Sequence, residues 1–209
     1  MKRLIYYFFF IIALLVSSNL QAQDAFLGLA MGGKLEDATK FYGTKGFTEL
    51  PSEDQLDSKK ALSLGGKSDD VFYKIHLFFT PKSKKIFKIR IDFNKTLSWD
   101  TLLTEYNNAV QGFTRKYQEP EVKNENFSSP YKKDQGTDQI KGLSEGKVVM
   151  VCKWKLKAEN EISVSAKGIA LRTTDGQTIY EGEVFLEYHN AAAKKIDEKE
   201  RQDNFNSKF

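Results

Sequence analysis

The sequence has a single cysteine, Cys152, and two histidines, His76 and His189, among its 209 residues. One cysteine excludes an intramolecular disulfide, and its place in the apolar run VVMVCKW favours a small buried hydrophobic residue over a reactive thiol. The histidines are far apart in the sequence and outside metal-type spacings such as H-E-x-x-H. The sequence therefore predicts no metal site and no cofactor.

The common motifs of nucleotide and acyl-transfer chemistry are also missing from the sequence. It contains no G-x-G-x-x-G, no phosphate loop and no G-x-S-x-G elbow. The segment LGGK at 64–67 lacks the glycine spacing of a phosphate loop. These absences favour a binding protein over an enzyme of those classes.

A long apolar run occurs at residues 4–16, and it is shorter than the roughly 20 residues of a membrane-spanning helix. Lys2 and Arg3 precede it, and a polar stretch with small residues follows as far as Ala22. This order is typical of a secretory signal peptide, so we expect residues 1–22 to be cleaved and the protein to be exported, either periplasmic or secreted. The mature chain then has no predicted transmembrane span.

Cleavage would also lower the net charge, because Lys2 and Arg3 leave with the signal peptide and the formal charge falls from +4 to +2. A nearly neutral chain gives no electrostatic argument for a nucleic-acid partner. The remaining 187 residues (209 minus 22) are enough for a hydrophobic core.

The first half of the mature chain alternates between helical and strand patterns. An extended lead-in at 26–31 precedes a short helix at 33–46, and a shorter strand is predicted at 61–66. Regular alternation of apolar and polar residues predicts a hairpin of strands 71–79 and 85–93. Ser98 can cap a long helix that ends before Pro120. The apolar stripe of this helix consists of Trp99, Leu103, Tyr106, Val110, Phe113 and Tyr117.

The second half is predicted to be mostly strands. Residues 121–138 are polar and rich in turn formers, which indicates a loop. Strands are predicted at 147–156, 161–171 and 183–190, with Asp175-Gly176 as a hairpin turn. The charged segment 191–209 is predicted as a helix or tail, with an Asp197–Arg201 pair at helical spacing.

This order of elements predicts an α+β fold, a curved antiparallel sheet with helices on one face and a charged C-terminal helix. We expect a single domain at 23–190, built from two helix-plus-strands units at about 26–93 and 97–188.

Several short motifs resemble a group of exported Gram-negative envelope proteins, of Bacteroidetes type and unknown function. The motifs are FLGLAMGG at 26–33, TKGF at 44–47, KIHLFF at 74–79, KIFKIRIDF at 85–93 and RKYQEP at 115–120. Gln118 stands where glycine is usual in that group. The arrangement is also similar to the β-lactamase-inhibitor-protein-like fold, in which two helix-plus-sheet units join into one curved sheet. The resemblance covers most of residues 26–190 and implies shape and export, but no catalytic residue.

The face of the predicted sheet opposite the helices combines cations with aromatic rings. Aromatic side chains supply contact area and cations steer an anionic partner, so this face is our candidate binding site. We expect the partner to be another envelope protein, a glycan or an anionic surface. The candidate residues are Phe72, Lys74, His76, Phe78, Lys88, Arg90, Lys153 and Lys155.

Two other hypotheses are compatible with the sequence. A hydrolase-type enzyme could assemble its site from distant segments, with His76, Asp92 or Glu187 in a deep pocket. A structural envelope protein could instead self-associate through the edges of its sheet. An ordinary solvated sheet face, kept soluble by its lysines, is the simplest interpretation of the cationic pattern.

Overall fold

The structure is a computed structural model that describes residues 25–26, 29–30, 32–51, 56, 60–68, 71–133 and 138–207. The predicted signal peptide lies outside the described residues, and so does part of the predicted loop at 121–138. Within the described residues, no helix is long and apolar enough to span a membrane.

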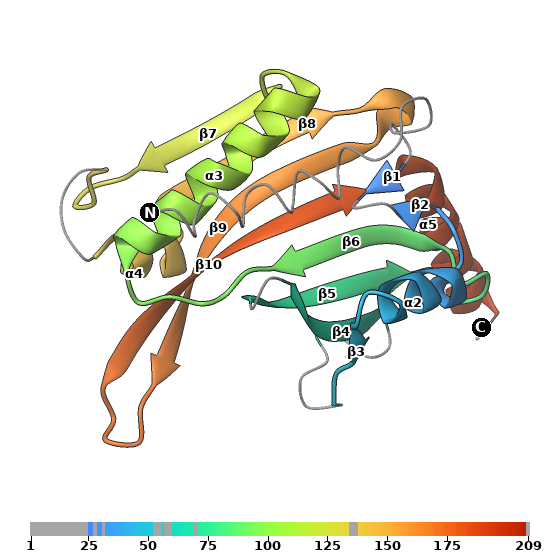
Figure 1. Cartoon of the computed structure of the whole chain (residues 1–209), viewed down its shortest axis with the longest axis horizontal. Coiled ribbons are helices and arrows are strands. Elements are labelled where there is room, and N and C mark those ends of the chain that lie inside the picture. The colour runs from blue at the N-terminus through green and yellow to red at the C-terminus, as the bar shows by residue number, and fades with distance from the viewer. Residues whose placement is uncertain are drawn as a thin grey trace. The chain divides into compact units, whose positions relative to one another are not determined.

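The main sheet has the strand order β3-β4-β5-β6-β10-β9-β8-β7, and Figure 1 shows its strands and the helices. A second sheet consists of two short strands, β1 (Ala25–Phe26) and β2 (Leu29–Ala30). The pairs β3–β4, β4–β5 and β7–β8 are antiparallel. The prediction of an α+β fold with an antiparallel sheet and a C-terminal helix is therefore confirmed.

The chain divides into two compact units. The first unit contains the chain up to Ile91, the segment Lys155–Ile162 and the chain from Glu187 onwards. The second unit contains Asp92–Trp154 and Ser163–Leu186. The prediction of a single domain at 23–190 stays a prediction.

In the first unit, helix α2 (Leu35–Gly43) precedes the strands β3 (Thr48–Glu49), β4 (Ala61–Ser68), β5 (Val71–Phe79) and β6 (Ile86–Asp92). The predicted hairpin is confirmed almost to the residue in its bounds, because the strands predicted at 71–79 and 85–93 appear as 71–79 and 86–92, and these strands are neighbours in the sheet. Leu64, Ile75 and Leu77 are buried on one face of these strands. Phe47, which contacts Tyr42 of α2, packs over Gly66 on that same face.

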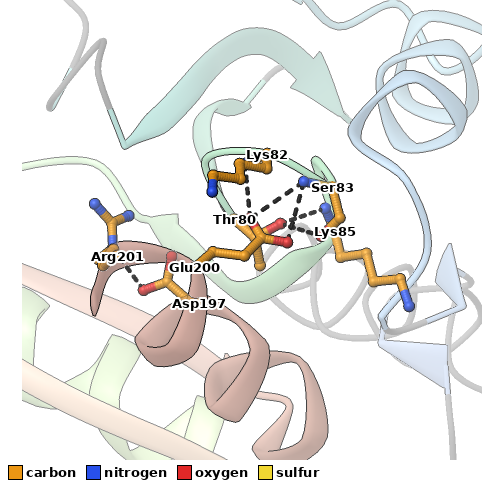
Figure 2. A network of polar contacts seen from close by, with 7 residues as sticks. All are labelled: Thr80, Lys82, Ser83, Lys85, Asp197, Glu200 and Arg201. Atoms are coloured by element: carbon orange, nitrogen blue, oxygen red, sulfur yellow. Dashed lines mark hydrogen bonds and ion pairs between the residues drawn. The ribbon is translucent and has the colours of Figure 1, made fainter. Parts of the chain in front are cut away.

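The C-terminal segment forms helix α5 (Ala191–Asn206), whose first turn is capped by Asn190 through a 2.8 Å bond from the Ala193 N–H. The predicted pair is present, with Arg201 Nε 2.8 Å from Asp197 Oδ2. Figure 2 shows how α5 meets the turn between β5 and β6, where the Glu200 carboxylate accepts hydrogen bonds from the Lys82 and Ser83 N–H groups. Within the first unit, the Glu200 carboxylate therefore holds α5 against the turn between β5 and β6.

The second unit begins with the long helix α3 (Trp99–Tyr117) and continues with β7 (Val122–Phe127), α4 (Gln139–Ser144) and β8 (Val148–Lys155). A 3₁₀ turn of the first unit, η2 (Lys157–Glu159), leads to β9 (Glu161–Arg172) and β10 (Thr178–His189), of which residues 163–172 and 178–186 belong to the second unit. β10 begins five residues before the predicted strand, because it continues to the hairpin turn at Gly176. The positive φ of 85° at Gly176 agrees with the predicted turn.

Helix α3 follows the prediction at both ends, but its buried stripe is shifted. Ser98 caps it by accepting a 3.3 Å hydrogen bond from the Thr101 N–H. The fully buried leucine is Leu102 rather than the predicted Leu103, which is half-buried. Leu102 lies against Gly182, where an added Cβ would come within 2.7 Å of the leucine side chain. Close approach to this strand glycine selects which leucine faces inward.

The prediction of a loop throughout residues 121–138 is wrong at its beginning. Residues 122–127 form β7, which pairs along its whole length with β8. The segment VKNENF has little intrinsic strand character, so pairing with the strongly apolar β8 determines its conformation. Tertiary context therefore overrides the polar composition of this segment.

The end of α3 carries backbone strain at Gln118. This residue has φ 70° and ψ −162°, a region that glycine occupies and other residues avoid at a cost of about 1–3 kcal/mol. The Gln118 carbonyl accepts a 2.9 Å hydrogen bond from the indole Nε1–H of Trp154, a buried residue of β8. This bond holds the chain in the strained conformation.

Replacing Gln118 with glycine is expected to raise the free energy of unfolding by about 1 kcal/mol, because glycine adopts this φ without a Cβ clash. Equilibrium urea unfolding of both proteins measures the difference. The matched control is Gln111→Gly in the exposed interior of α3, which is expected to lower the free energy by about 1 kcal/mol. Lower stability of the Gln118→Gly variant would contradict the assignment of strain.

Candidate functional site

Six of the eight predicted binding residues lie together in the first unit. Because side chains alternate along a strand, the residues of β5 that do not face α2 emerge on the other face of the sheet. Lys88 shares that face, since its Nζ lies 4.0 Å from the centre of the Phe78 ring, and Arg90 follows two residues later. The structure therefore brings together Phe72, Lys74, His76 and Phe78 of β5 with Lys88 and Arg90 of β6.

The middle of this face is closed to solvent. His76 is 3 % exposed, and its Nδ1 lies 2.7 Å from the hydroxyl oxygen of Ser63 on β4, which is 0 % exposed. The Leu56 N–H donates a 3.1 Å hydrogen bond to the same hydroxyl oxygen. His76 was expected on a solvated face, but the structure places it in a buried polar contact that joins β4 to β5. Neither side chain of this pair is open to a substrate here.

At one end of the face, the Lys88 ammonium is paired with a carboxylate of the same unit. Lys88 Nζ lies 3.1 Å from Glu187 Oε1 of β10, and His189 Nε2 lies 3.2 Å from Glu187 Oε2. Burial works against the Glu187 charge, but the hydrogen bond from His189 and the Lys88 ammonium outweigh it and lower the pKa of Glu187 to about 2. The ammonium of Lys88 is thus held between a ring and a carboxylate.

The other end of the face is open and centred on Phe72, which is 38 % exposed. In the β4–β5 register Lys67 lies directly opposite Phe72, and Gly65 lies opposite Lys74. A Cβ at Gly65 would lie 2.5 Å from the Leu50 side chain and 2.8 Å from the Phe72 ring, so glycine alone allows both to lie across β4. Phe72 is therefore supported from below and flanked by two lysines.

Lys67 is a residue of this site that the sequence analysis missed. It directly follows the predicted strand at 61–66 and belongs to the segment LGGK, which lacks the spacing of a phosphate loop. The pairing of residues 61–68 with 71–78 places it beside Phe72. The apolar pattern of residues 61–67, set against that of 71–79, is the sequence signal that could have identified it.

The two remaining predicted residues lie on β8. Lys153 is half-buried in β8 and belongs to the second unit. Lys155 lies at the end of β8 and forms an exposed ion pair with Glu159, with 2.9 Å between Nζ and Oε2. Exposed ion pairs of this kind contribute little to stability. The binding roles predicted for both residues stay predictions.

The second unit contains the single cysteine in the buried environment that its sequence context indicates. Cys152 is 0 % exposed, its Sγ lies 3.3 Å from the Tyr106 hydroxyl, and burial raises the pKa of the thiol. Such a thiol packs as a hydrophobic side chain. In the part of the chain that the structure describes, no group of three or more His, Cys, Asp or Glu side chains is arranged to hold a metal ion.

Comparisons of the chain with protein-family models, with curated proteins and with solved structures find no match. The resemblance to exported envelope proteins and to the β-lactamase-inhibitor-protein-like fold therefore stays a prediction.

The Glu187 cluster makes stability depend on acid pH. Because the folded pKa lies below the ordinary value near 4.5, the stabilisation is complete above that value and is lost as the pH falls toward 2. We expect Glu187→Gln to lower the free energy of unfolding at pH 7 by about 1–2 kcal/mol, a range reduced for partial exposure. The difference from the native protein should shrink steadily between pH 5 and pH 2, as measured by urea unfolding at several pH values.

The control for this measurement is Glu181→Gln. Glu181 also pairs with a lysine, Lys95, but the Nζ–Oε2 distance is 3.5 Å and both side chains are more exposed. We expect a change below about 0.5 kcal/mol. Equal losses in the two variants, or a loss in Glu187→Gln that does not vary with pH, would show that Glu187 does not carry the acid dependence.

Proposed function

We propose that the protein is an exported binding module, whose open end of the β4–β5 face binds an acidic surface on another envelope protein. The binding site consists of Phe72, Lys67 and Lys74, which we call the Phe72 site. The proposal of export rests on the basic start and apolar run of residues 1–22, and no catalytic step is part of it.

The position of the exposed Phe72 ring directly opposite the exposed Lys67 is the observation that carries this proposal. The Phe72 ring is 38 % exposed, so part of its apolar surface is in contact with water. A partner that covers this surface gains the free energy of burying it. Aromatic side chains are enriched among the residues that dominate binding energy at interfaces. The ring also lies over Gly65, where an added Cβ would come within 2.8 Å of it, so little side-chain freedom is lost when a partner packs on it.

Charge selects the kind of partner. Lys67 is exposed and lies across from the ring, while Lys74 is half-buried and follows two residues after Phe72 on the same face. The exposed ammonium group of Lys67 beside an apolar ring favours a surface that presents a carboxylate next to an apolar patch. The neutralised end, where Lys88 is paired with Glu187, contributes less to steering because its charge is already compensated.

The proposal predicts that Phe72→Ser and Lys67→Glu each abolish or strongly reduce capture of one partner. Mature protein, beginning near residue 23, is crosslinked in envelope extract and the captured proteins are identified by mass spectrometry. We expect at least a tenfold loss of the specific partner in each variant, equivalent to about 1.4 kcal/mol. Raising the salt concentration should weaken capture by the native protein.

Two variants serve as matched controls. Ile179→Ser removes another apolar side chain of almost the same exposure, 37 %, from the β10 end of the hairpin. Lys199→Glu makes the same charge change on an exposed position of α5. Both should capture the partner as the native protein does. If the Phe72 site variants remain folded by circular dichroism and capture the same proteins as the controls, the Phe72 site is not the binding surface.

A further inference from the structure

Strand β7 ends the main sheet and leaves one of its edges unpaired in the described structure. It is the last strand in the sheet order, and of the residues that the structure describes only those of β8 pair with it (Figure 1). The strand is largely exposed along its six residues. The opposite edge strand, β3, has only two residues, which is too short to accept a partner strand.

The backbone groups that point away from β8 can be assigned from the register. The Ser128 N–H donates a 2.9 Å hydrogen bond to the Lys147 carbonyl, next to the Phe127–Val148 pair. Hydrogen-bonded and non-bonded positions alternate in an antiparallel pair, so the even-numbered residues of β7 bond to β8. The N–H and C=O groups of Lys123, Glu125 and Phe127 therefore point to the free edge.

The side chains at these positions carry opposite charges. Lys123 and Glu125 share one face of β7, with 3.6 Å between Nζ and Oε1. Lys133 Nζ also lies 3.1 Å from Oε2 of the same carboxylate. Phe127 continues this face and packs edge-on against Trp99, with the ring centres 6.1 Å apart. The free edge thus presents an ordered row of one cation, one anion and one ring.

This row is complementary to itself when a second strand runs antiparallel to it. With the two-fold axis at Asn124, Lys123 of each strand lies opposite Glu125 of the other. Both are positions whose backbone groups point outward, so the charged pairs coincide with hydrogen-bonded pairs. On the other face the two Asn124 amides meet at the axis, and Val122, which is exposed, lies beside Asn126 of the other strand.

The neighbouring two-fold registers are unfavourable for identifiable reasons. An axis at Glu125 would place two carboxylates opposite each other, and an axis at Lys123 would do the same with two ammonium groups. A shift of one residue would pair outward backbone groups with groups already bonded to β8, and would turn the charged residues toward the wrong face. Charge and hydrogen bonding therefore select the register centred on Asn124.

We propose that β7 pairs with β7 of a second copy of this chain, in the antiparallel register centred on Asn124. In this arrangement each carboxylate has an ammonium group beside it on its own strand and another across the interface, so the four charges alternate in sign. The inference uses residues of the second unit alone and is independent of the Phe72 site.

Sedimentation equilibrium of the mature protein over a range of concentrations tests this pairing, and the native protein is expected to form a dimer that dissociates on dilution and at high salt. Lys123→Glu replaces both opposite-charge pairs with like-charge pairs and should weaken the dimer at least about tenfold. The triple variant Lys123→Glu/Glu125→Lys/Lys133→Glu reverses the charge of Glu125 and of both lysines that contact it, and it should restore dimerisation to within a few-fold of the native value.

A second edge variant keeps the charge of Glu125 and tests the backbone hydrogen bonds of the free edge. Lys123→Pro removes an N–H that points to the free edge, so pairing with β8 keeps its hydrogen bonds while pairing with another β7 loses one on each strand. It should be monomeric. Lys199→Glu and Phe72→Ser should dimerise like the native protein, which separates this contact from net charge and from the Phe72 site.

Circular dichroism and unfolding curves establish that each variant is folded. A native protein that stays monomeric at the highest concentration measured would overturn the proposal. So would a dimer that is equally strong in folded Lys123→Glu and Lys123→Pro, or a charge reversal that fails to restore the association lost in the single variant.

Discussion

The alternation of side chains along β5, held in register by β4, is the constraint on which the candidate site depends. Ile75 and Leu77 are buried on the side of α2, and this forces Phe72 and Lys74 to emerge on the opposite face. A slip of one residue would expose the leucine and bury the lysine, which apolar burial strongly opposes. The same register places Lys67 beside Phe72. The β4–β5 register therefore places the hydrophobic core of the first unit on one face of these strands and the candidate binding surface on the other.

Electrostatic compensation divides that surface into parts with different properties. Lys88 is enclosed by the Phe78 ring and the Glu187 carboxylate, so its charge stabilises the fold. His76 is enclosed with Ser63, so its imidazole joins two strands. At the Phe72 end, an aromatic ring and Lys67 remain exposed. A pattern of cations and aromatics on a strand thus becomes a structural cluster at one end and a candidate contact surface at the other.

The second unit shows how pairing imposes structure on segments with weak local preferences. β7 is polar and follows a helix end, yet it forms six pairs with β8. Gln118 is held in a backbone region typical of glycine, where its carbonyl accepts the Trp154 indole N–H. A buried indole N–H without an acceptor would be costly, which gives a physical reason for the strain at this residue. Both features depend on β8, the apolar strand that pairs with β7 and contains Trp154.

The sequence by itself determined the elements whose signals are local. The two strands within residues 71–93, the Ser98 cap, the Asp175-Gly176 turn and the Asp197–Arg201 spacing each follow from signals within a few residues, and each appears in the structure as expected. Only the tertiary structure decided that residues 122–127 form a strand, that Leu102 replaces Leu103 in the core, that His76 is buried on Ser63 and that Lys67 joins the site. These outcomes depend on which distant segments lie side by side, because strand pairing and close packing are interactions between segments that no local pattern specifies.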